Sequence, residues 1–304
     1  MYETRYGLRH RPFLATPDVA GYYPATGHER ALARLRQAID DQEGLALLTG
    51  EPGTGKTLLA HHLLNNLGPK TISALVTNCH FRDRTALLQA ILYDLSLPYE
   101  GGSEQELRLR LTDFLLQQSR AGQAVVLVLD EAHHLTPDLL EELRLLGNLE
   151  AGDKKALHII LVAQADLLET LKQPGLVALQ QRLEARITLE PLGVEEAADY
   201  VLHHLRRAGA RPEAIVSDEC LGMLARHSRG VPRILNQAAR QALLLADAAE
   251  AEYVDAEAAM EALAGLGIEI AEPEEPERVS LIANADVEDS DAACRLYDAP
   301  RRVL

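Results

Sequence analysis

Two short stretches of the chain carry residues whose types and spacing could bind a nucleoside triphosphate and cleave it. The first, residues 50–57, is Gly-Glu-Pro-Gly-Thr-Gly-Lys-Thr and matches the pattern GxxxxGK[ST]. It follows an apolar run at 44–49 and precedes a helical pattern. In that context the glycines let successive backbone N–H groups surround phosphate oxygens, and the positive end of the helix faces the same charges.

Each residue of this loop has an expected place around the ligand. Lys56 would reach the β- and γ-phosphates, and the hydroxyl of Thr57 would coordinate Mg²⁺. We therefore predict ATP and Mg²⁺ as ligands. The predicted binding segment comprises Gly50, Glu51, Pro52, Gly53, Thr54, Gly55, Lys56, Thr57 and Leu58.

The second stretch, "VVLVLDEAHH" at 125–134, ends an apolar run in two carboxylates, Asp130 and Glu131. Carboxylates at the end of a buried strand are unfavourable unless a cation or water uses them. Asp130 is expected to hold the magnesium shell, and Glu131 to position and deprotonate the attacking water.

The letters D-E-A-H within this stretch also name a class of RNA helicases. The chain has neither room for a second motor domain nor the Q-x-x-G-R-x-G-R segment of those helicases. We interpret Asp130-Glu131 as the chemical part and Ala132-His133 as incidental. The doublets His61-His62, His133-His134 and His203-His204 form no HExxH pattern, so no metal site besides that for Mg²⁺ is predicted.

Four further residues could contact the γ-phosphate. Gln164 follows the apolar run 157–163 and could orient water or sense phosphate loss; the alternative is a solvent-facing strand end. Arg182 and Arg186, expected just before the last core strand, could neutralise transition-state charge in a neighbouring subunit. Arg233 could reach the same phosphate from its own subunit. The alternative for each arginine is a solvated surface charge.

These residues must be positioned by a fold that alternates strands with helices. Apolar runs at 44–49, 71–77, 124–129 and 157–163 predict buried strands of a parallel sheet covered by helices. Helices are predicted behind the capping box Ser103 to Glu106 and at Thr136-Pro137. We predict an irregular N-terminal segment over 1–27, an α/β nucleotide-binding core over 28–191, an all-α lid over 192–268 and a flexible acidic tail over 269–304.

The composition indicates which kinds of partner and which cellular compartment fit this chain. Acidic residues outnumber basic ones by 46 to 30, giving a net charge of −16, which is unusual for a protein that binds nucleic acid through phosphates. Cys79, Cys220 and Cys294 have no CxxC spacing, which fits a reducing cytoplasm. The apolar runs are strand-sized, so we expect no transmembrane segment.

Taken together, the motifs resemble those of the AAA+ ATPases, most closely the ExeA-like group. The resemblance begins at Tyr6-Gly7-Leu8 and Arg11-Pro12-Phe13, passes through both nucleotide motifs and Gln164, and ends near Arg233. The resemblance implies an ATP-driven ring or filament in which adenine binds near the N-terminal segment and the lid. It also implies that Gln164 is sensor 1 and Arg233 is sensor 2. Arg182 or Arg186 would be the arginine finger that acts on the ATP of a neighbouring subunit. Members of the group continue into a membrane-spanning segment and a cell-wall-binding domain, whereas the sequence here continues into a short acidic tail. We therefore expect no direct cell-wall role for this polypeptide.

Two roles remain open. The first is a switch that acts on a protein partner, in secretion-apparatus or envelope biogenesis, which the resemblance and the acidic balance favour. The alternative is a DNA-binding ATPase, since the same motor type is similar to transposition target-selection and origin-recognition ATPases. Local basic clusters at Arg206, Arg207 and Arg211, and at Arg226, Arg229 and Arg233, motivate that alternative.

Overall fold

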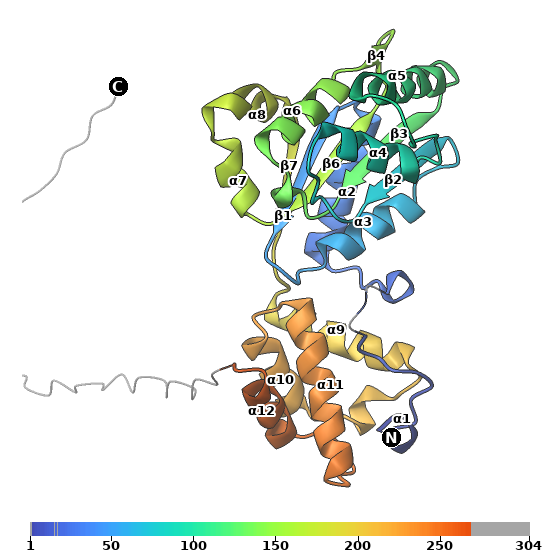
Figure 1. The fold of residues 1–304 in the computed structure, drawn as a ribbon. Coiled ribbons are helices and arrows are strands. Elements are labelled where there is room, and N and C mark those ends of the chain that lie inside the picture. Colours follow the sequence, from blue (N-terminus) through green and yellow to red (C-terminus); the bar gives the residue numbers. More distant parts are fainter. Residues whose placement is uncertain (1, 15, 17, 269–304) are drawn as a thin grey trace, which may run out of the picture. The chain divides into compact units, whose positions relative to one another are not determined.

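Five parallel strands form the sheet that carries the candidate site (Figure 1). The structure, a computed structural model, describes residues 2–14, 16 and 18–268. The strands are β1 (Leu45–Gly50), β2 (Thr71–Val76), β3 (Ala124–Leu129), β6 (His158–Ala163) and β7 (Leu183–Leu189), in the order β2-β3-β6-β1-β7. The apolar runs β1, β3 and β6 occupy the three central places, as strands covered on both faces require.

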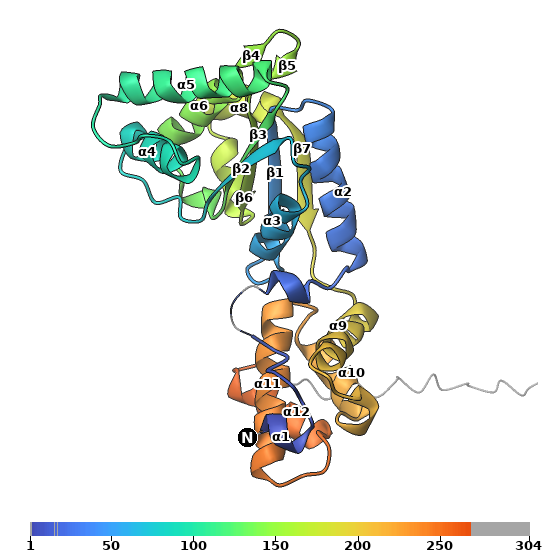
Figure 2. The same cartoon turned by 90° about the vertical axis from the view of Figure 1, so that its right-hand side faces the viewer.

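Side chains of the central strands alternate between two layers of helices. Val125, Leu127 and Leu129 of β3 join one buried cluster, whereas Val126 and Val128 join another. This alternation follows from the two-residue period of a strand. The first cluster includes α4 (Arg84–Asp94), α5 (Glu104–Arg120), α6 (Pro137–Leu146), α7 (Asp166–Leu171) and α8 (Val177–Arg182), and the second includes α2 (Thr26–Asp40) and α3 (Lys56–Asn65). Figure 2 shows α2 and α4 on opposite sides of the sheet.

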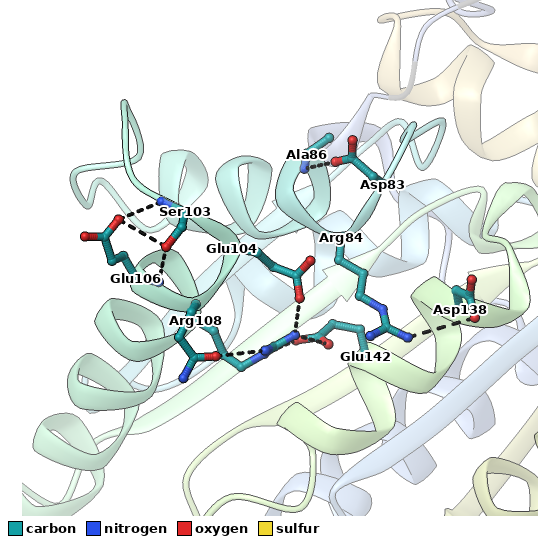
Figure 3. Close-up of polar contacts among 10 residues, drawn as sticks. Asp83, Arg84, Ala86, Ser103, Glu104, Glu106, Arg108, Asp138 and Glu142 are labelled. Carbon is teal, nitrogen blue, oxygen red and sulfur yellow. Dashed lines mark hydrogen bonds and ion pairs between the residues drawn. The ribbon is translucent and has the colours of Figure 1, made fainter.

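Polar contacts fix the start of α5 and its packing on α6 (Figure 3). The predicted capping box is confirmed, because Ser103 accepts from the backbone of Glu106 and the Glu106 carboxylate accepts from the backbone of Ser103. Arg108 of α5 donates two hydrogen bonds, of 2.8 and 2.7 Å, to the buried carboxylate of Glu142 on α6. As predicted, α6 begins at Pro137, although the side chain of Thr136 makes no capping bond.

The chain after the sheet is helical, with α9 (Val194–Arg207), α10 (Asp218–His227), α11 (Pro232–Ala248) and α12 (Ala256–Gly265). These helices share their own hydrophobic cluster, which also buries Tyr2 of α1 (Tyr2–Arg5), Tyr6, Leu8 and Phe13. The N-terminal segment is therefore part of the helical layer's core. The predicted fold class, a parallel sheet between helices followed by further helices, is confirmed.

The predicted acidic tail over 269–304 lies outside the described residues. Within the described part of the chain, no helix combines the length and the apolar character needed to cross a bilayer.

Candidate nucleotide site

The glycine-rich loop connects β1 to α3 and takes a conformation that only glycines adopt easily. Gly53 and Gly55 have φ values of 87° and 98°, and Gly55 is the N-cap of α3. A Cβ atom on Gly53 would lie 2.8 Å from the Cβ of Arg233. The loop is thus close to the first turn of α11, where the backbone nitrogen of Arg233 donates a 3.2 Å hydrogen bond to the oxygen of Gly53.

The ammonium of Lys56 lies inside this loop. Its Nζ donates to the backbone oxygens of Gly50 and Glu51, at 2.9 and 2.8 Å. Burial lowers the pKa of Lys56, while the nearby carboxylates of Glu131 and Asp130 oppose that shift. Lys56 is therefore held at the site by backbone acceptors that a stronger anionic acceptor can replace.

Asp130 and Glu131 stand at the end of β3, next to the first turn of α3. The hydroxyl of Thr57 donates a 2.7 Å hydrogen bond to Oδ2 of Asp130, and the backbone nitrogen of Glu131 donates to Oδ1 at 2.9 Å. Burial raises the pKa of Asp130, and the Thr57 bond acts in the opposite direction. Glu131 has a φ of 55°, a left-handed conformation that is strained for a glutamate and turns the chain at the strand end.

Gln164 follows β6, which lies between β1 and β3 in the sheet. The carboxyl ends of parallel strands meet at one edge, so this order brings Gln164 between the glycine-rich loop and Asp130-Glu131. Gln164 is half-buried and contacts His133, with its amide nitrogen 3.3 Å from Nε2 of the ring. Sequence reasoning took His133 as incidental and so missed this contact.

A cavity of about 880 Å³ opens beside these residues. Its walls include five residues of the predicted site, which are Lys56, Thr57, Glu131, Gln164 and Arg233. Other walls come from the N-terminal segment and the helices that follow the sheet, and include Pro12, Phe13, Tyr200, His204, Asn236 and Arg240. Beside the charged groups of the glycine-rich loop, the cavity thus offers both aromatic rings and polar side chains.

The remaining loop residues divide into two groups. Pro52, Gly53, Gly55 and Leu58 line the cavity, whereas Gly50, Glu51 and Thr54 are not among its lining residues. Thr54 is buried, and its backbone oxygen is 2.9 Å from Nε2 of His28 in α2. Sequence reasoning missed His28 as well, since a single histidine carries no spacing signal.

The two candidate finger arginines do not line this cavity. Both are exposed, and Arg186 donates a 2.6 Å hydrogen bond to the backbone oxygen of Gln180. The prediction that both precede the last strand was wrong for Arg186, which lies within β7, while Arg182 ends α8. β7 is an edge strand whose polar residues alternate outward, so Arg186 faces away from the core, and Arg182 at the end of α8 is exposed as well.

The residues present fit a Mg²⁺–nucleotide ligand. Mg²⁺ prefers oxygen ligands, and the Thr57 hydroxyl and the nearly fully buried carboxylate of Asp130 supply two within hydrogen-bonding distance of each other. The glycine-rich turn before α3 presents backbone N–H groups and a helix N-terminus, which suit phosphate.

Another group of donors lies close by, since Glu131, His133 and His134 each offer one ligand atom, all within 4.8 Å of one another. The backbone nitrogen of Gln164 lies 3.5 Å from Nδ1 of His133 and can only donate. The neutral ring then carries its hydrogen on Nε2, which faces Glu131. In this tautomer neither nitrogen of His133 offers a lone pair to a cation at the cluster.

The fold and the site together define a P-loop protein of the AAA+ class. A family model described as an AAA domain matches residues 39–171. Solved structures with the same fold include Cdc6p from Pyrobaculum aerophilum, with a TM-score of 0.65 and 20% identity over 84% of this chain and 72% of that one. Drosophila ORC bound to DNA has a TM-score of 0.63 and 21% identity over 86% of this chain and 65% of that one.

Sequence comparison narrows the class further. General secretion pathway protein A of Aeromonas hydrophila is 39% identical over 247 residues, which are 81% of this chain and 45% of that protein. A Holliday junction branch migration complex subunit RuvB, from Chlorobium phaeobacteroides, is 27% identical over 279 residues, 88% of this chain and 70% of RuvB. The predicted resemblance to the AAA+ ATPases of the ExeA-like group is confirmed. The chain spans less than half the length of the secretion protein.

Proposed function

We propose that this chain binds ATP with Mg²⁺ and hydrolyses it, using Lys56, Thr57, Asp130 and Glu131. The observation that carries the proposal is the contact between Thr57 and Asp130, next to a cavity that Thr57, Lys56 and Glu131 line. It joins the two motifs that the chemistry needs, although 73 residues separate them in the sequence. The matched AAA domain model and the similarity to general secretion pathway protein A support the same activity at a general level.

Each residue has a defined task in this proposal. The loop from Gly50 to Leu58 binds the phosphates, and Lys56 exchanges its backbone acceptors for phosphate oxygens. Thr57 and Asp130 hold Mg²⁺, which would neutralise charge on the phosphates. Glu131 orients the attacking water and accepts its proton, and Gln164 and Arg233 contact the γ-phosphate from the sheet and from α11.

The activity is tested by phosphate release from ATP, with Mg²⁺ and with a chelator. We expect turnover only with Mg²⁺, and we expect Lys56→Ala to weaken ATP binding by at least about tenfold because it removes a charged contact. Lys70→Ala is the matched control, since Lys70 is exposed and lies outside the lining of the cavity. Equal ATP affinity in the wild type and Lys56→Ala would contradict the proposal.

The proposed active form is a ring or filament, in which an arginine of one subunit completes the site of the next. Arg182 and Arg186 are exposed near one edge of the sheet and do not line the cavity of their own subunit, which is what a trans role requires. We expect the rate per subunit to rise with protein concentration, and to stop rising in either Arg182→Ala or Arg186→Ala. A rate independent of concentration and unaffected by both substitutions would contradict this.

The proposed role is an ATP-dependent switch in the cytoplasm that acts on a protein partner, in secretion-apparatus or envelope biogenesis. The identity to general secretion pathway protein A supports it. So does the net charge of −16, which disfavours binding to a polyanion.

A DNA-dependent ATPase is the second candidate, because the relatives include a Holliday junction branch migration subunit. Against it, Arg206 and Arg207 in one basic cluster donate to Glu213 and Asp18. Double-stranded DNA at low salt separates the two roles. We expect it to leave the ATPase rate unchanged, whereas salt-sensitive stimulation by DNA would favour the second candidate.

A further inference from the structure

His133, in the short 3₁₀ helix η2 (Ala132–His134), lies between two residues of the proposed site. Its Nε2 is 3.3 Å from Oε2 of Glu131 and 3.3 Å from the side-chain amide of Gln164. Its Nδ1 is 3.5 Å from the backbone nitrogen of Gln164. The side chain is only 7% exposed. One buried ring therefore contacts both the proposed base and the proposed phosphate sensor.

The partners of the ring determine where its hydrogen lies. The backbone nitrogen of Gln164 can only donate, so Nδ1 must accept. The carboxylate of Glu131 can only accept, so Nε2 must carry the hydrogen. A neutral imidazole in the Nε2–H form satisfies both. The amide of Gln164 then presents its oxygen to Nε2, since amide oxygen and nitrogen are exchanged by a half-turn about the last bond. The single Nε2–H hydrogen is shared between this oxygen and Oε2 of Glu131, both 3.3 Å away.

The backbone is shaped to bring these groups together. The left-handed conformation of Glu131 turns the chain immediately after β3, and Oδ1 of Asp130 accepts from the backbone of Glu131 within this turn. Because β6 is the neighbour of β3, the end of β6 places Gln164 beside the turn. Backbone strain in a non-glycine residue persists only where the surroundings enforce it.

We propose that His133 is a positioning residue that couples Gln164 to Glu131. Its Nε2–H holds the Glu131 carboxylate, and Gln164 holds the ring through both its backbone and its side chain. When Gln164 contacts a γ-phosphate, the ring follows it and re-aims the carboxylate at the attacking water. The inference rests on the proposed function, and it adds the means by which the site distinguishes a bound triphosphate from a diphosphate.

Substitutions of His133 by Phe and by Gln test this coupling. Phe fills a similar space without a donor, and the amide nitrogen of Gln lies near the position of Nε2. We expect His133→Phe to lower kcat by about 10- to 100-fold, as misplacement of a catalytic group does, and to leave the Kd for ATP within about twofold. His133→Gln should recover most of the lost kcat. His10→Phe is the matched control, since His10 is exposed and does not line the cavity.

A second measurement separates coupling from a merely structural role. If His133 acts through Gln164, then Gln164→Ala combined with His133→Phe should be no slower than the slower single variant. Multiplied losses in the double variant would overturn the proposal, as would a kcat of His133→Phe within about twofold of the wild type. A wild type without ATPase activity would overturn the proposed function itself, whereas an active wild type with an equally active His133→Phe overturns only the role of His133.

Discussion

The hydroxyl of Thr57 and the carboxylate of Asp130 are joined by a 2.7 Å hydrogen bond that connects the first turn of α3 to the end of β3. Asp130 is buried, and burial raises its pKa. The Thr57 bond favours the charged form, which is the form that can hold a cation. This contact joins the glycine-rich motif and the Asp130-Glu131 motif in one site.

Replacement of Thr57 tests that contact directly. Thr57→Ala removes both the donor to Asp130 and the proposed ligand for Mg²⁺, so we expect hydrolysis at limiting Mg²⁺ to fall by at least about tenfold. Thr57→Ser keeps the hydroxyl and should remain within about threefold of the wild type. Phosphate release measured across a Mg²⁺ series checks both. Similar Mg²⁺ dependence in Ala and Ser variants would show that the hydroxyl has no such role.

The glycine-rich loop should not tolerate a side chain at Gly53. Its φ of 87° is strained for alanine, and the added Cβ would meet the Cβ of Arg233 at 2.8 Å. We expect Gly53→Ala to weaken ATP binding by about tenfold or more, because the loop must shift to relieve the contact. Gly68→Ala is the control, since a Cβ there meets nothing within 4 Å. The comparison is a nucleotide titration of both variants, and equal affinities would refute the expectation.

The ion pair between Arg108 and Glu142 should stabilise the fold without affecting the site. The Glu142 side chain is 0% exposed, so Arg108→Ala leaves a buried carboxylate without its cation and should lower the free energy of unfolding by about 3–5 kcal/mol. Arg144→Ala removes a similar pair with Glu141, which is 33% exposed, and should lower it by no more than about 1 kcal/mol. Urea denaturation compares the two, and equal losses would contradict the distinction between buried and exposed pairs.

Acid should destabilise the protein partly through His204. Burial, aided by His203 and Arg207, lowers the pKa of His204 to about 4, whereas Asp18 acts in the opposite direction. The unfolded chain, with a pKa near 6.5, therefore takes up a proton that the folded chain resists. Stability is retained above about pH 6.5 and is lost as the pH falls from there towards about 4.

Removing His204 should flatten this dependence. The free energy of unfolding should fall in both proteins as the pH is lowered from about 7 to about 4.5. In His204→Phe this fall should be smaller than in the wild type by about 2–3 kcal/mol. Denaturant titrations at the two pH values measure the difference. An unchanged pH dependence would show that the imidazole of His204 is not kept neutral by its surroundings.

Sequence patterns correctly predicted the strands that are buried on both faces of the sheet. The central strands β1, β3 and β6 are apolar on both faces, so composition alone identified them. The edge strand β7 alternates buried and exposed residues, and its exposed Arg186 was therefore placed before the strand instead of within it. For the site, the glycine-rich loop was predicted from the fixed spacing within its motif, and Asp130-Glu131 from two carboxylates that end an apolar run. His28 and His133 were missed because their contacts, with Thr54 and Gln164, join segments with no spacing rule between them.

The central claim is that Glu131 activates water for the cleavage of a bound ATP. The most direct measurement compares ATP binding and phosphate release in the wild type and in Glu131→Gln, which has nearly the same shape but a much weaker base. We expect the variant to bind ATP within about threefold of the wild-type affinity and to release phosphate at least about 100-fold more slowly. Phosphate release by Glu131→Gln at the wild-type rate would contradict the account.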